Sequence, residues 1–87
     1  SVGATPLLVA CQDGHIAIVQ LLLASGASVA NSDCLFLAAQ NGHFEVVRLL
    51  IIAGMTFDTP TESGATPLWI AASEGHIRVV ELLVAAG

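Results

Sequence analysis

Three histidines, His15, His43 and His76, are the side chains of this 87-residue sequence best suited to metal chemistry. Each follows a glycine, and 28 positions separate the first pair while 33 separate the second. A shared zinc ion would require ring nitrogens about 2.0–2.1 Å from the metal. Recurrence at one position of stacked helical units would instead set the rings roughly 8–10 Å apart. We therefore predict no metal site and a structural role, in which each histidine ties its turn to a neighbouring backbone.

The two cysteines, Cys11 and Cys34, are the next candidates for chemistry. They lie far apart in the sequence without CxxC spacing, so they form no disulfide framework. We expect small buried side chains in a reducing compartment, and hence an intracellular protein of the cytoplasm or nucleus. No nucleophile is paired with a base, and each glycine has a turn or cap role and belongs to no phosphate loop. The sequence predicts no enzyme activity and no cofactor.

The composition restricts the class of protein further. Apolar residues make up 55% and charged residues 10%, which is typical of a folded chain. The longest apolar or glycine stretch, residues 49–57, is interrupted by Thr56 and is far shorter than the roughly 20 residues of a membrane helix. We expect no membrane insertion. The chain has only two arginines, no lysine and a net charge of −5, so we expect no nucleic-acid partner either.

The remaining charged side chains are scattered over positions expected to be exposed. Two pairs have the i, i+3 spacing of neighbours on a helix, Glu45 with Arg48 and Arg78 with Glu81. We predict that both are surface ion pairs of little energetic weight and that neither marks a site.

Self-similarity is the strongest signal in the sequence. Residues 7–26, 35–54 and 68–87 align, and each segment contains two short apolar stripes with i, i+3 spacing, which predict two helices. Thr5 and Thr66 precede prolines and are good N-caps for the first helix. Glycine closes each second helix, where the left-handed conformation is needed. Small residues in the first helices, such as Ala38 and Ala71, allow neighbouring helices to pack closely.

These motifs resemble the ankyrin repeat family: GATPL at residues 3–7 and 64–68, a Gly-His turn, and then VVxLLxxAG. The resemblance implies an all-α solenoid of helix–turn–helix units with short β-hairpin or loop fingers. It implies one domain over residues 1–87, with repeats at approximately 3–30, 31–58 and 62–87. It also implies a concave partner-binding surface made by the fingers and the first helices.

The connection between the first two repeats departs from the family pattern. Five fewer residues separate Gly26 from Asp33 than separate Gly54 from Thr66, the residue aligned with Asp33. One interpretation is a shortened finger, in which Asp33 is the N-cap and Cys34 stands at the proline position. The other is that a finger tip is missing from the sequence between Asp33 and Cys34.

A second departure concerns the histidine of the family's TPLH motif, which is replaced by Leu8, Phe36 and Trp69. Stacking would align these three into an apolar ladder with a polar rim, as in the centre of a protein interface. The alternative is that they pack on one another under the fingers. The predicted partner-binding residues are Leu8, Gln12, Asp13, Phe36, Gln40, Asn41, Glu62, Ser63, Ala65, Trp69, Ser73 and Glu74.

The predicted function is a scaffold that binds another protein or peptide through this concave surface and the fingers. Its acidic balance favours a basic or amphipathic segment of the partner. The alternative is a spacer or stalk within a longer ankyrin array attached to a catalytic or channel domain. Neither end repeat has the polar outer face of a cap. We therefore expect a segment of a longer array or a chain that associates with copies of itself.

Overall fold

The computed structural model describes residues 6–26, 33–54 and 66–86, which form six helices and contain no strand. In chain order the helices are α1 (Pro6–Asp13), α2 (Ile16–Ala24), α3 (Asp33–Gln40), α4 (Phe44–Ile52), α5 (Pro67–Ser73) and α6 (Ile77–Ala86). The predicted all-α helix–turn–helix architecture is confirmed. The finger segments, with the predicted binding residues Glu62, Ser63 and Ala65, lie outside the described residues.

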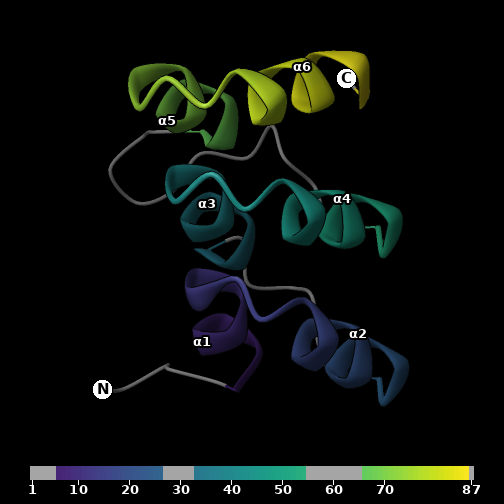
Figure 1. Cartoon of the computed structure of the whole chain (residues 1–87). Coiled ribbons are helices and arrows are strands. Elements are labelled where there is room, and N and C mark those ends of the chain that lie inside the picture. The colour runs from purple at the N-terminus through teal and green to yellow at the C-terminus, as the bar shows by residue number, and fades with distance from the viewer. Residues whose placement is uncertain (1–5, 27–32, 55–65, 87) are drawn as a thin grey trace.

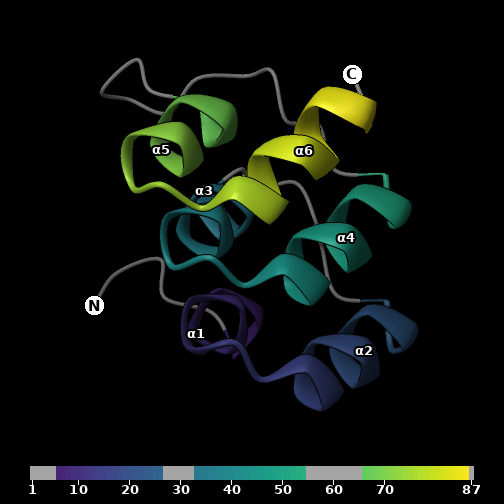
Figure 2. The ribbon, with the colours of Figure 1, turned by 45° about the horizontal axis from the view of Figure 1, so that its top comes forward.

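The helices form three stacked pairs, as Figure 1 shows. The first helices α1, α3 and α5 make one column and the second helices α2, α4 and α6 make the other, an order that the turned view in Figure 2 repeats. Within each column every helix packs against the next one. All six are seven to ten residues long, and none in the described part of the chain is long and apolar enough to cross a membrane.

The helix starts follow the local sequence. Thr66 has extended backbone angles (φ −98°, ψ 162°), and its Oγ1 accepts a hydrogen bond of 3.2 Å from the Trp69 amide. The threonine cap is therefore confirmed for α5, whereas Thr5 lies outside the described residues. Asp33 is not the residue before α3 but its first helical residue, and Cys34 follows it within the helix. A carboxylate is favourable there because the first-turn amides have no helical acceptor.

The core runs through the contacts between repeats. Apolar side chains from all six helices are buried, and no polar side chain among the described residues is. Ala10, Ala38 and Ala71 are almost fully enclosed, which confirms that small side chains bring neighbouring first helices close together. Ala72 is the exception, since it is exposed where its equivalents Cys11 and Ala39 are fully buried. Among the described helices, none packs on the face of the third repeat where Ala72 lies.

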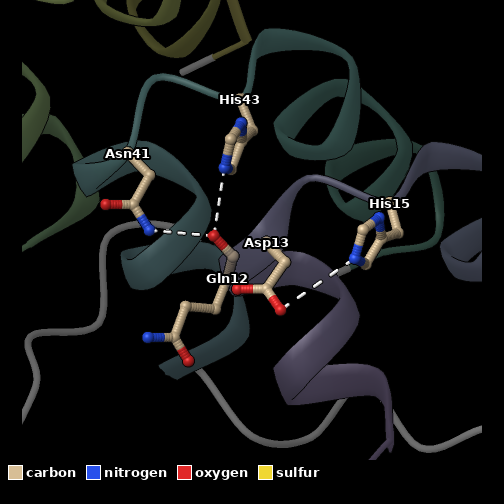
Figure 3. A network of polar contacts seen from close by, with 5 residues as sticks. All are labelled: Gln12, Asp13, His15, Asn41 and His43. Atoms are coloured by element: carbon tan, nitrogen blue, oxygen red, sulfur yellow. Dashed lines mark hydrogen bonds and ion pairs between the residues drawn. The ribbon is translucent and has the colours of Figure 1, made fainter.

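A histidine joins the second repeat to the first, and another joins the third repeat to the second. The Nε2 atom of His43 donates to the Gln12 carbonyl oxygen at 3.0 Å, as Figure 3 shows, and Nε2 of His76 donates to the Gln40 carbonyl at 2.9 Å. The predicted histidine role is thus confirmed for His43 and His76. His15, in the first repeat, lies 4.0 Å from the Asp13 carboxylate, and it bonds no backbone carbonyl among the described residues.

The glycine of each turn makes room for this ring. Gly14 and Gly42 have φ values of +75° and +72°, and a Cβ atom at either would lie 2.7 Å from the histidine ring of the next repeat. Gly75 has the same left-handed backbone (φ +77°), but a Cβ atom there would meet nothing within 4 Å. The first two glycines therefore serve both the turn and the stacking, while Gly75 serves the turn alone.

This difference predicts unequal effects of one substitution. Gly75→Ala should cost about 1–2 kcal/mol of unfolding free energy, because alanine resists the left-handed conformation. Gly42→Ala carries the same backbone penalty and also displaces the His76 ring, which adds about 1–3 kcal/mol. Urea denaturation followed by circular dichroism measures both. Equal losses for the two variants would contradict a stacking role for the His76 ring.

Candidate protein-interaction surface

The predicted apolar ladder occupies one position of three successive first helices. Leu8 on α1 and Phe36 on α3 are half-buried and pack against the core. Trp69 on α5 is 59% exposed. The Thr66 cap closes the N-terminus of α5, the seven-residue helix that carries this indole. The three ladder residues therefore differ: two contribute largely to packing, and Trp69 leaves most of its surface open to contact.

The polar residues predicted beside the ladder fall into two groups. Gln12, Asp13, Ser73 and Glu74 are exposed, and Gln40 is half-buried. Asn41 is also exposed, but its Nδ2 donates to the Gln12 carbonyl at 2.9 Å, the same oxygen that accepts from His43.

Asn41 therefore takes part in the contact between the first two repeats, as Figure 3 shows. The sequence interpretation missed this role. The sequence contains a feature that could have indicated this role. The equivalent residues Asp13 and Glu74 are carboxylates, so Asn41 alone of the three can donate a hydrogen bond without first being protonated.

Both arginines lie on second helices and are engaged there. Arg48 forms the predicted pair with Glu45, with Nη2 at 2.8 Å and Nε at 3.2 Å from the same carboxylate oxygen. The predicted pair of Arg78 with Glu81 is wrong. The Arg78 guanidinium lies 4.4 Å from the centre of the Phe44 ring of the preceding repeat, where cation–π attraction replaces an exposed ion pair.

The described parts of α1, α3 and α5 consequently carry no cationic side chain. Their charged residues are all acidic: Asp13 on α1, Asp33 at the start of α3, and Glu74 directly after α5. The first-helix surface, which we define as the exposed side chains of these helices around the ladder, is therefore apolar and acidic.

The two cysteines are neighbours in space, although they are distant in the sequence. Cys11 on α1 and Cys34 on α3 are both free thiols and almost completely buried, as predicted. A side-chain hydrogen bond with Cys34, together with burial, raises the pKa of Cys11 well above that of an ordinary thiol. A protonated, enclosed thiol is a poor nucleophile and a poor metal ligand. Among the described residues, no group of three potential ligands could hold a metal ion.

These features define a helical repeat protein that offers an extended surface and, in its described part, no assembled reactive group. Comparison with protein-family models matches the ankyrin repeat model to residues 7–87 in three copies. The chain belongs to the ankyrin repeat family. A search of the curated proteins returned no match. Ankyrin repeats generally mediate protein–protein interactions.

The buried thiol pair predicts unreactive cysteines in the folded protein. We expect an aromatic disulfide reagent to modify neither Cys11 nor Cys34 under native conditions and both in denaturant, because each thiol is enclosed between α1 and α3. Absorbance of the released thiolate measures this directly. Rapid modification of either cysteine without unfolding would contradict the described packing of the first two repeats.

Proposed function

We propose that this chain binds a basic, amphipathic segment of a partner protein through the first-helix surface, with Trp69 as the anchor. The observation that carries the proposal is the exposure of this indole on a capped helix, 59% of its surface being open to solvent. A single tryptophan can supply a large share of an interface's binding energy, because it buries a large area with few rotatable bonds.

The residues beside Trp69 support its proposed role as the anchor. Ser73, one helical turn further on, and the neighbouring Glu74 are exposed and polar. An apolar anchor inside a polar rim is the usual arrangement of an interface hot spot. Leu8 and Phe36 extend the apolar row along the stack and support it from the core side. The fingers, with Glu62, Ser63 and Ala65, are part of the proposed surface by sequence position alone.

Charge supports the chemistry proposed for the partner. The chain carries a net charge of −5, and the described parts of α1, α3 and α5 hold acids without a compensating cation. Opposite charge on the partner accelerates encounter and selects its orientation. Phosphate-bearing partners are disfavoured for the same reason, since both arginines are engaged on second helices. We further propose an intracellular location, which the free buried thiols support.

Substitution of the anchor tests this function. Trp69→Ala should weaken partner binding by about 2 kcal/mol or more, roughly thirtyfold in Kd, while the helical content of the stack stays the same. Ile77→Ala is the matched control, because Ile77 is an exposed apolar side chain of the same repeat that lies outside the first-helix surface. A pull-down with the Phe36→Ala/Trp69→Ala double variant identifies partners that require the ladder. Calorimetric titration of one such partner then measures the affinities.

Two results would contradict the proposal. One is a loss of thermal stability in Trp69→Ala with unchanged affinity in the protein that remains folded, since Trp69 would then be a packing residue. The other is retention of every partner by the double variant. That result would favour the alternative function, a spacer whose first helices contact only neighbouring structure.

A further inference from the structure

We propose that a groove along the Gly-His turns binds an acidic, amphipathic peptide segment of a second partner. A carboxylate of that segment pairs with Arg78, and a neighbouring apolar side chain fills the hollow beside it. The groove lies at the start of the second helices. Trp69 is in the first turn of α5, whereas the groove lies beyond the last residue of that helix, Ser73. The groove and the first-helix surface are therefore separate sites, and this proposal does not rest on the function proposed above.

The groove consists of two adjoining hollows that share one wall, formed by Phe44 and Arg78. One hollow has a volume of about 240 Å³ and also includes Ile16 of the first repeat and Glu45 of the second. The other has a volume of about 350 Å³, lies between the second and third repeats, and also includes Ile77. Small-molecule sites usually measure about 300–1,000 Å³. Hollows at the lower end of this range suit single side chains of a peptide.

The shared wall holds a cation whose donors are open. The Arg78 guanidinium lies over the Phe44 ring, 4.4 Å from its centre. Its N–H groups have no acceptor and no carboxylate partner within the described part of the chain. Attraction to the ring positions the cation, while the N–H groups at the edge of a stacked guanidinium remain able to donate. A carboxylate can accept two of them in parallel, which makes a strong and directional pair.

The charges around the groove favour an anionic ligand. Glu45 lines one hollow, but its carboxylate is paired with Arg48 at 2.8 Å. The two arginines balance Glu45 and Glu81 on the second helices, so the net charge of −5 lies entirely on the rest of the chain. Of the described cations, Arg78 is the one that lacks a carboxylate partner. An acidic segment is therefore repelled by the first-helix surface and attracted to this groove.

The side chains beside Arg78 favour an apolar neighbour for that carboxylate. Ile16, Phe44 and Ile77 each follow the histidine of their repeat, so they form an apolar row along the groove. Ile16 is 41% exposed, and Phe44 is half-buried. An apolar side chain of the partner that covers this row removes apolar surface from water. A segment in which an acidic residue lies next to an apolar one satisfies both parts of the groove.

Peptide titration of the isotope-labelled full chain tests the proposal by NMR. The probe is a soluble peptide that alternates leucine and glutamate. The chain has two arginines and one tryptophan, so their side-chain N–H signals can be followed separately. We expect a saturable shift of the Arg78 Nε–H signal, with the signals of Arg48 and the Trp69 indole unchanged. Arg78→Gln should weaken binding roughly tenfold or more, as measured by fluorescence anisotropy of the labelled peptide, because charge-assisted hydrogen bonds are lost.

Gln20→Glu is the matched control. It lowers the net charge by the same single unit as Arg78→Gln, at an exposed α2 position that lines neither hollow, so it should keep the affinity of the unaltered chain. A second peptide with glutamine in place of glutamate should bind roughly tenfold more weakly or worse. Circular dichroism verifies the helical content of both variants.

Four results would overturn the proposal. The first is the absence of a saturable shift of the Arg78 signal. The second is equal affinity for the glutamate and glutamine peptides, which would indicate apolar contact alone. The third is unchanged affinity in Arg78→Gln. The fourth is an equal loss of affinity in Gln20→Glu, which would indicate a response to the overall charge of the chain and not to the groove.

Discussion

The contact between a histidine ring and the glycine turn of the preceding repeat is the interaction on which the rest of the stack depends. A helix of seven to ten residues leaves its last carbonyls unsatisfied and is too short to be stable alone. His43 and His76 each bond one such carbonyl, and the ring fits only because Gly14 and Gly42 lack a side chain. One residue pair thus closes a helix end and sets how closely two repeats approach.

The packing between repeats also determines which side chains are available for binding. Stacking uses the apolar faces of all six helices and turns the position of Leu8, Phe36 and Trp69 away from the centre of the core. The arginines are engaged on the second helices, one with Glu45 and the other with the Phe44 ring. The exposed side chains that remain on the first helices are acidic and apolar. The proposed binding surface therefore consists of side chains that the packing between repeats does not use.

The same dependence on neighbours explains why the end repeats differ from the middle one. In a solenoid each repeat contacts only the repeats beside it. The folding free energy is therefore a sum of the packing within repeats and the contacts between neighbouring repeats. The second repeat has both faces covered, and its largest core residues, Leu35 and Leu50, are fully buried. The first and third repeats have nearly the same sequence pattern with one face uncovered. Exposed apolar side chains at the two ends therefore follow from position in the stack and not from a different local sequence.

Periodicity and spacing determined the repeats, the helix pairs, the Thr66 cap and the structural histidines, because these depend on local rules that each repeat restates. Only the tertiary structure showed that Cys11 contacts Cys34 and that Asn41 donates a hydrogen bond to the Gln12 carbonyl. It also showed that Arg78 packs over the Phe44 ring and not beside Glu81. Each of those contacts joins residues about 23 to 34 positions apart in two neighbouring repeats. The sequence of one repeat alone does not specify how its side chains align with those of the next.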